Sequence, residues 1–148
     1  MGGFADNVGD WAKESEARLT ACFRRAVELL ADEMTTTRSK GGKLPHRTGN
    51  LMRSLLASTT AMPRTGDGPF VGQDIGLVAA GLDLGDTIYI GYQAAYARRL
   101  NYGFVGDDSL GRTYNQEGAH FVEYAASMWP ILVQLAAEEV RNKVMTRA

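Results

Sequence analysis

Two long stretches with helical periodicity frame this chain and constrain its fold more than any other feature. From about Asp6 to Thr36, and again from Ala119 to about Val144, apolar residues recur at steps of three and four residues, the spacing of one helix face. The first helix would be about 45 Å long at ~1.5 Å per residue, which is long for a small domain. We therefore expect part of it to seek a partner. The first stripe comprises Trp11, Leu19, Cys22, Phe23, Ala26, Val27, Leu30 and Met34.

A proline lies inside the second helical stretch. Pro130 has no backbone N–H, and its ring clashes with the carbonyl group four residues earlier. We expect it to kink the helix or to divide it near Ser127. The apolar stripe of this helix comprises Phe121, Val122, Ala125, Met128, Trp129, Leu132, Val133, Leu135, Ala136, Val140 and Val144.

Shorter elements are predicted between the two long helices. A short helix is indicated after Pro45, with Thr48 as a good N-cap and an end near Ser58. Residues 74–82 and 87–92 are predicted to be two strands joined as a hairpin, although alternation is clear only in the second run. The buried face of the short helix is expected to comprise Leu51, Met52, Leu55 and Leu56.

The second half of the central region combines one more short helix with polar loops. Residues 94–100 predict the helix, and Gly103 can supply the left-handed residue that ends it. Polar or Gly- and Pro-rich stretches at 37–44, 59–72 and 105–118 are expected to be flexible, the last as an exposed loop or a long hairpin tip.

These elements predict an α+β domain, in which long N- and C-terminal helices pack on a small antiparallel β-sheet. The 148 residues are the length of a single domain, with a core expected at about 5–143. The net charge of −1 argues against a strongly basic nucleic-acid binder. The single Cys22 excludes an internal disulfide, and no apolar run approaches a membrane span. We expect a soluble protein of a reducing compartment.

The residues that usually carry enzyme chemistry form no recognisable motif. The sequence has no Walker loop, no GxSxG, no HExxH and no GxGxxG. His46 and His120 have no acid placed locally to complete a triad, and Cys22 lies on an apolar stripe, where it packs as a small hydrophobe. The adjacent pairs Asp107–Asp108 and Glu138–Glu139 are expected to be solvated. We therefore predict no enzymatic activity, no cofactor and no metal.

Three stretches in a fixed order carry a family resemblance. The first runs from Pro45 to Leu55 and contains Arg47-Thr48-Gly49. The second is Tyr89-Ile90-Gly91 followed by Tyr-Ala-Arg-Arg-Leu-Asn-Tyr-Gly at 96–103, and the third is Gly-Ala-His-Phe-Val at 118–122. This order resembles the tail-completion or tail-terminator family, the small head–tail joining proteins of long-tailed bacteriophages. The resemblance covers roughly residues 5 to 143.

The resemblance and the local physics together indicate which residues shape the domain and which contact partners. Thr48 can accept backbone N–H groups at a helix start, and Gly49 permits a tight turn there. Tyr and Arg are the residue types enriched in interface hot spots. The residues expected to be structural are Arg47, Thr48, Gly49, Leu51, Ser54, Ala97 and Gly103. The residues expected at an interface are Tyr96, Arg98, Arg99 and Tyr102.

One position departs from the family pattern. The family usually has an acid where this chain has Asn101. If that acid pairs with the arginine of the Arg-Thr-Gly turn, the ion pair is missing here. Either a hydrogen bond from Asn101 replaces it, or Arg47 finds another acid.

The resemblance implies a non-enzymatic structural protein of the virion neck, placed at the head–tail junction after assembly in the host cytoplasm. The implied partners are further copies of the chain in a hexameric ring, the tail tube protein and the head-closure or stopper protein. The ring would cap the tail tube and join it to the head connector, while genomic DNA passes through the lumen. Because loops on a rigid scaffold commonly carry binding, residues 59–72 and 105–118 are the expected contacts.

Three other functions stay open from the sequence. A head-closure or stopper protein is the nearest, although such proteins are usually more β-rich. A small-molecule-binding α+β domain would need a pocket around Trp11, Trp129 and the tyrosines. A nucleic-acid-binding protein would use four arginines and show steep salt dependence. These arginines are Arg24, Arg25, Arg98 and Arg99.

Overall fold

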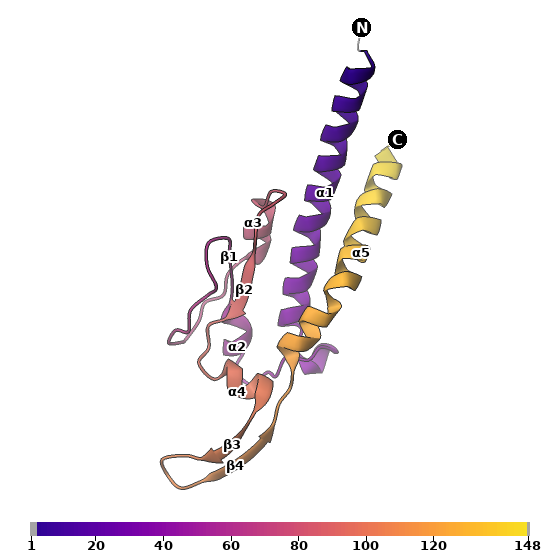
Figure 1. Cartoon of the computed structure of the whole chain (residues 1–148). Coiled ribbons are helices and arrows are strands. Elements are labelled where there is room, and N and C mark those ends of the chain that lie inside the picture. Colours follow the sequence, from indigo (N-terminus) through magenta and orange to yellow (C-terminus); the bar gives the residue numbers. More distant parts are fainter. Residues whose placement is uncertain (1–2, 148) are drawn as a thin grey trace.

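The computed structural model describes residues 3–147, so residues 1, 2 and 148 of the predicted single domain lie outside the described part. Two long helices, α1 (Phe4–Thr35) and α5 (Phe121–Arg147), lie side by side and run in opposite directions (Figure 1). The short elements pack beside them, as the predicted α+β fold requires. They are η1 (Arg38–Lys40), α2 (Asn50–Arg53), β1 (Leu55–Ser58), α3 (Ile75–Ala80), β2 (Tyr89–Tyr92), α4 (Ala97–Tyr102), β3 (Gly103–Asp107) and β4 (Thr113–Glu117).

The hairpin predicted from residues 74–82 and 87–92 is wrong. The first run forms helix α3, because a short apolar run bounded by turns fits a buried helix as well as a strand. Strand β2 pairs instead with β1, in antiparallel register from Leu55 opposite Tyr92 to Ser58 opposite Tyr89. The sheet is therefore closed by segments more than thirty residues apart, which the local pattern does not show.

The short helix predicted to end near Ser58 also needs correction. Helix α2 ends at Arg53, and Ser54 turns the chain into β1. The Ser54 hydroxyl donates to the carbonyl of Leu51 at 2.7 Å, while the Ser54 carbonyl accepts the backbone N–H of Gln93 at 2.9 Å. Leu55 is thus buried as a strand residue, and the helical face ends before it.

The core consists of two apolar clusters. The larger one joins α1, α3, β1 and α5, and includes Val27, Leu55, Ala79, Leu82 and Ala125. The smaller one lies under α2 and α4 and comprises Leu44, Leu51, Ala94, Ala97 and Phe121. The phenol of Tyr92 connects the sheet to α1, since it donates to the carbonyl of Met34 at 2.6 Å, and burial raises the pKa of this phenol.

Helix α1 extends well past the end of α5. Arg25 Nε lies 2.6 Å from Glu139 Oε2, which fixes the antiparallel register of the pair. Counting eight residues from each partner brings Arg147 level with Ala17. Residues 4–16, which we call the overhang, therefore project beyond α5 (Figure 1).

The overhang leaves part of the predicted apolar stripe uncovered. Trp11, in the overhang, is 68% exposed, and Leu19, just beyond it, is 57% exposed, so the first part of the predicted stripe faces solvent. Val27 and Met34, further along the same helix, are buried. The physical reason is that α5, α3 and the sheet cover only the second half of α1.

The remaining predictions concern the effect of Pro130 on α5 and the three stretches that were expected to be flexible. Helix α5 continues through Pro130, so the proline does not divide it near Ser127. Strands β3 and β4 form an antiparallel hairpin, which confirms the hairpin alternative for the stretch 105–118, and η1 lies inside the stretch 37–44. Residues 59–72 contain neither a helix nor a strand. None of the helices described here is long and apolar enough to cross a membrane.

Candidate interaction surface

The Arg-Thr-Gly turn owes its shape to glycine. Gly49 has φ +82°, in the left-handed region, and a Cβ added there would lie 2.7 Å from Arg53 Nη1. Gly49, rather than the predicted Thr48, is the N-cap residue of α2, although the Thr48 hydroxyl accepts the backbone N–H of Asn50 at 3.3 Å. Arg53 closes the turn by donating to the carbonyl groups of Thr48 and Phe70.

Asn50 connects this turn to two other segments, a role that the sequence reasoning missed. Its Nδ2 donates to the Tyr96 hydroxyl at 2.9 Å, and its Oδ1 accepts the backbone N–H of Phe70 at 3.0 Å. Asn50 therefore holds the residue before α4 and the loop 59–72 against α2. Its place directly after Arg-Thr-Gly was visible in the sequence, but its partners lie 20 and 46 residues away.

Tyr96 and Leu100 separate two adjoining hollows. The first, about 530 Å³, lies over the Arg-Thr-Gly turn. The second, about 500 Å³, lies against the β3–β4 hairpin. The structure thus brings Arg47, Thr48 and Gly49 beside Tyr96. Arg47 is exposed.

The other predicted interface residues lie on α4 or at its end, but not all at these hollows. Arg99 lines the second hollow with its guanidinium 4.4 Å from the ring centroid of Phe104, a cation–π contact. Arg98 and Tyr102 are exposed and line neither hollow, and Tyr102 is 62% accessible. Of the predicted structural residues nearby, Ala97 is buried and Gly103 begins β3.

Gly103 is required where α4 passes into the hairpin. It has φ +88°, and an added Cβ would lie 2.6 Å from the carbonyl oxygen of Gln116 on β4. The two strands can therefore meet closely only with glycine at this position. The hairpin projects from the end of the molecule opposite the overhang (Figure 1).

The tip of the hairpin is organised by one carboxylate. Asp108 accepts the backbone N–H groups of Leu110 and Arg112 and the Arg112 guanidinium, the last at 2.6 Å. These bonds, first that of the Arg112 backbone N–H, lower the pKa of the Asp108 carboxyl. The turn between β3 and β4 is therefore held by several hydrogen bonds to one side chain.

The side chain of Asn101 on α4 forms hydrogen bonds with the start of α5. The residue is 2% exposed; its Oδ1 accepts the backbone N–H of Val122 at 3.0 Å, and its Nδ2 donates to Glu123 at 2.9 Å. It therefore caps the start of α5 from α4. The pKa of Glu123 is lowered, first by its own backbone N–H and then by Asn101. A hydrogen bond from Asn101 to Arg47 is not formed.

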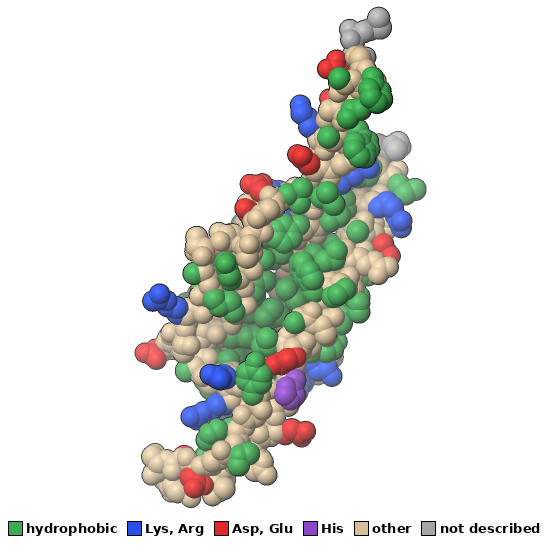
Figure 2. Space-filling view, viewed as in Figure 1, with side chains coloured by type: hydrophobic (Ala, Val, Ile, Leu, Met, Phe, Trp, Pro, Cys, Tyr) green, Lys and Arg blue, Asp and Glu red, His purple; other side chains and the backbone are tan. Residues whose placement is uncertain are grey.

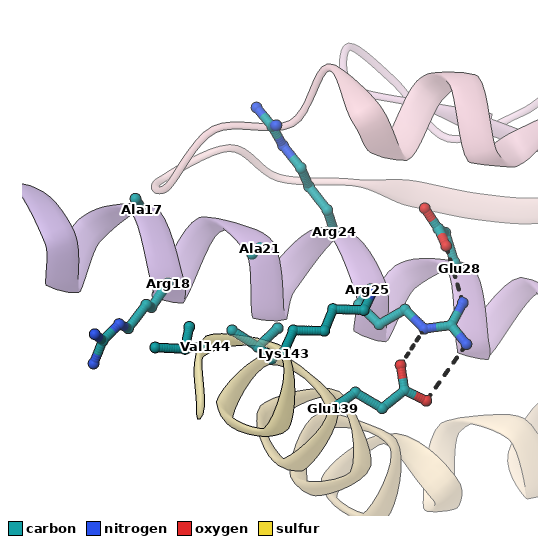
Figure 3. A pocket seen from close by; sticks show the side chains of 10 residues that line it. Ala17, Arg18, Ala21, Arg24, Arg25, Glu28, Glu139, Lys143 and Val144 are labelled. Carbon is teal, nitrogen blue, oxygen red and sulfur yellow. Dashed lines mark hydrogen bonds and ion pairs between the residues drawn. The ribbon is translucent and has the colours of Figure 1, made fainter. Parts of the chain in front are cut away.

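A charged groove lies between α1 and α5, next to the overhang (Figure 3). Arg25 occupies its middle, between Glu28 at 3.0 Å and Glu139 at 2.6 Å. Arg24 points away from α5 and donates to the carbonyl of Leu82 at 2.7 Å (Figure 3). The residues that line this groove of about 450 Å³ are Ala17, Arg18, Ala21, Arg24, Arg25, Glu28, Glu139, Val140, Lys143 and Val144.

The clusters on which the alternative functions depend do not form. Arg24 and Arg25 lie on α1 with acidic partners, while Arg98 and Arg99 lie on α4, so the four arginines make no single patch. An apolar hollow of about 460 Å³ does contain Trp129, together with residues of α1 and β2. Figure 2 shows apolar side chains along the middle of this face. Trp11 does not line this hollow, so Trp11 and Trp129 do not share the pocket that a small-molecule-binding domain would require.

The titratable residues considered for chemistry are separated. His46 and His120 are exposed, and His120 lies 3.7 Å from Glu123. Cys22 is half-buried on α1, and burial raises the pKa of its thiol. Within residues 3–146, no group of three or more His, Cys, Asp or Glu side chains is placed to hold a metal ion. What the surface offers is exposed Tyr and Arg side chains around shallow hollows.

Comparison with known proteins adds no relative: no family model, no curated protein and no solved structure matches this chain.

Proposed function

We propose that this chain is a structural subunit of a bacteriophage neck, which forms a ring that caps the tail tube and joins it to the head connector. It has no enzymatic role, and genomic DNA passes through the ring. The proposal starts from the order of the three stretches described above, which resembles the tail-completion family.

The observation that carries the proposal is that two asparagine side chains link segments of all three stretches near the end of the molecule that carries α4. Asn50 binds the first stretch to Tyr96 of the second, and Asn101 binds the second to Val122 of the third. A set of motifs that only shaped separate parts of the domain would not need these cross-links. That end presents Arg98, Tyr102 and the projecting hairpin to solvent.

The shape of the molecule is also suited to a ring subunit. The hairpin and the overhang project from opposite ends, so the surface proposed for other neck proteins is separate from a surface that can meet a further copy of the chain (Figure 1). Contacts between two different surfaces of identical subunits generate closed rings when the rotation closes. The hairpin and loop 59–72 remain the proposed contacts to the tail tube and the head connector.

Tube-length control tests this function directly. The tail tube protein is polymerised with and without this chain, and tube lengths are measured by electron microscopy. We expect capped tubes to stop growing, with rings at one end. The double substitution Arg98→Glu and Tyr102→Ala should weaken capping without unfolding the chain, because both side chains are exposed.

The control for this experiment reverses the charge of a residue that is not among the predicted interface residues. Arg38→Glu on η1 is exposed and lies outside both hollows. Tubes that grow equally long with or without the wild-type chain would contradict the proposed function. Tubes capped normally by the Arg98/Tyr102 variant would remove these two residues from the interface.

A further inference from the structure

We propose that the overhang of one copy docks in the groove between α1 and α5 of a second copy, so that each subunit donates one helix end and receives another. This inference deepens the proposed function, on which it rests for the ring, and it names the surfaces through which the ring closes.

The overhang is a helical segment whose apolar face is exposed, as expected of a helix that packs against a partner. Phe4, Val8 and Trp11 recur at steps of four and three residues, so they share one face. Phe4 is 84% exposed, and nothing in the described chain covers this stripe. Isolated helices of this length are marginal in water, because most helix stability in proteins comes from packing of the apolar face. A covering surface would therefore stabilise it.

The groove matches the overhang in length and in shape. The overhang contains thirteen residues, from Phe4 to Glu16, which is about 20 Å at ~1.5 Å per residue. The groove extends along α1 from Ala17 to Glu28, which is about 17 Å on the same basis. Its floor carries small or branched side chains, namely Ala17, Ala21, Val140 and Val144, that leave room for an aromatic anchor.

The charges of the two surfaces are opposite. The overhang carries four acids and one base, a net charge of −3. The groove is lined by four bases and two acids, a net charge of +2. Arg24 and Arg25 already have acidic partners, so Arg18 and Lys143 are the bases left to meet an acidic helix. The acids of the overhang are Asp6, Asp10, Glu14 and Glu16, and its base is Lys13.

The same charges argue against pairing of two overhangs. Such a contact would place one net charge of −3 against another, and like charges at an interface suppress association. Docking of an overhang in a groove is a contact between two different surfaces, which is the type that closes a ring. Each subunit would bury its Phe4 and Trp11 against one neighbour, and the other neighbour would cover its groove.

The test is a charge exchange between two variants, followed by light scattering of the full-length chain. One variant reverses the overhang with Asp10→Lys and Glu14→Lys, and the other reverses the groove with Arg18→Glu and Lys143→Glu. All four side chains are exposed, so folding should persist, which circular dichroism verifies. We expect the wild-type chain to self-associate and each variant alone to do so at least about tenfold more weakly.

Mixing the two variants gives the decisive result. The reversed overhang then meets the reversed groove, and the unchanged overhang meets the unchanged groove, so we expect the mixture to assemble like the wild type. The matched control, Arg38→Glu with Lys40→Glu on η1, should assemble normally, because both residues lie outside overhang and groove.

Two results would overturn the docking contact, and a third would contradict the proposed function but not the contact. If only the overhang variant loses assembly, two overhangs pair or another surface receives them, and the inference is overturned. A wild-type chain that stays monomeric at millimolar concentration also overturns it. Rings that need this contact but do not shorten tail tubes would contradict the proposed function and leave the docking contact standing.

Discussion

The two halves of α1 carry the same kind of apolar stripe but have opposite surroundings. In the second half, Val27 and Met34 are buried by the sheet, α3 and α5. In the first half, Phe4 and Trp11 face solvent on a helix that extends beyond α5. The difference teaches that periodicity reports which face of a helix needs cover, whereas the lengths of neighbouring elements decide whether the same chain supplies it.

Truncation of one apolar side chain in each half should give the largest contrast. We expect Met34→Ala to lower the free energy of unfolding by about 2–5 kcal/mol, since it opens a cavity in the core. Leu19→Ala, at a residue 57% exposed, should change it by less than about 0.5 kcal/mol. Urea unfolding of the dilute monomer measures both. Equal losses would mean that the first half of α1 is packed in solution.

The start of α5 offers the next largest effect, because Asn101 anchors the helix that covers only half of α1. Asn101→Ala removes a buried acceptor from the Val122 N–H and a donor from Glu123, and should cost about 1–3 kcal/mol of unfolding free energy. Asn142→Ala, at an exposed position of α5, is the matched control and should be near neutral.

An acid at the same position separates the two hydrogen bonds. Asn101→Asp keeps the acceptor for Val122 but places a second carboxylate against Glu123. We expect a loss of stability that grows as the pH rises through the carboxylate range, because the two charges then repel. A pH-independent loss would show that the contact with Glu123 does not stabilise the start of α5.

Amide hydrogen exchange should sharpen the comparison between the two halves of α1. Amides between residues 22 and 34 are expected to be protected by the core, whereas those of the overhang should exchange quickly in the dilute chain. Raising the protein concentration should slow exchange in the overhang if a second copy covers it. Trp11→Ala should abolish that slowing and change monomer stability by less than about 0.5 kcal/mol.

The smallest expected effect concerns the ion pair that fixes the register of α1 and α5. The Arg25 guanidinium holds the pKa of Glu139 below its ordinary value of 4.5. A lowered pKa in the folded state means that the stabilisation is fully present above about pH 4.5 and is lost as the pH falls through the folded pKa. The effect should be small, because the pair is partly exposed.

Acid unfolding of two glutamine variants measures this contribution. Glu139→Gln should lower stability at neutral pH and flatten the decline below about pH 4.5. Glu138→Gln, its exposed neighbour, should leave the decline unchanged. Identical acid profiles for the two variants would remove the ion pair from the forces that align the helices.

Sequence reasoning performed best where one element carries its own signal. The two long helices follow from periodicity, and the turn at Gly49 follows from glycine conformation. The helix predicted at residues 94–100 exists, although the structure places it at Ala97–Tyr102. Sequence reasoning failed at β1 and α3, where short apolar runs fit either conformation. The pairing of Leu55 with Tyr92 supplied the missing information, because a strand exists only when a partner takes up its backbone hydrogen bonds.

The candidate surface divides in the same way. The residue types at the Arg-Thr-Gly turn and at α4 could be identified from the sequence. The roles of Asn50 and Asn101 could not, because a side-chain amide bonds whatever the fold brings near it, here Tyr96, Phe70, Val122 and Glu123.

By itself, the amino-acid sequence determined the long N- and C-terminal helices of this protein, their apolar stripes and the glycines that its turns require. These features depend on neighbours a few residues away in the chain. Only the tertiary structure decided which halves of those stripes are buried, which strands pair and where the groove lies. Those outcomes depend on how far α5 reaches along α1 and on contacts between residues distant in the chain. The apolar stripe from Phe4 to Trp11 shows both effects, because local periodicity places these residues on one face and the limited reach of α5 leaves that face exposed.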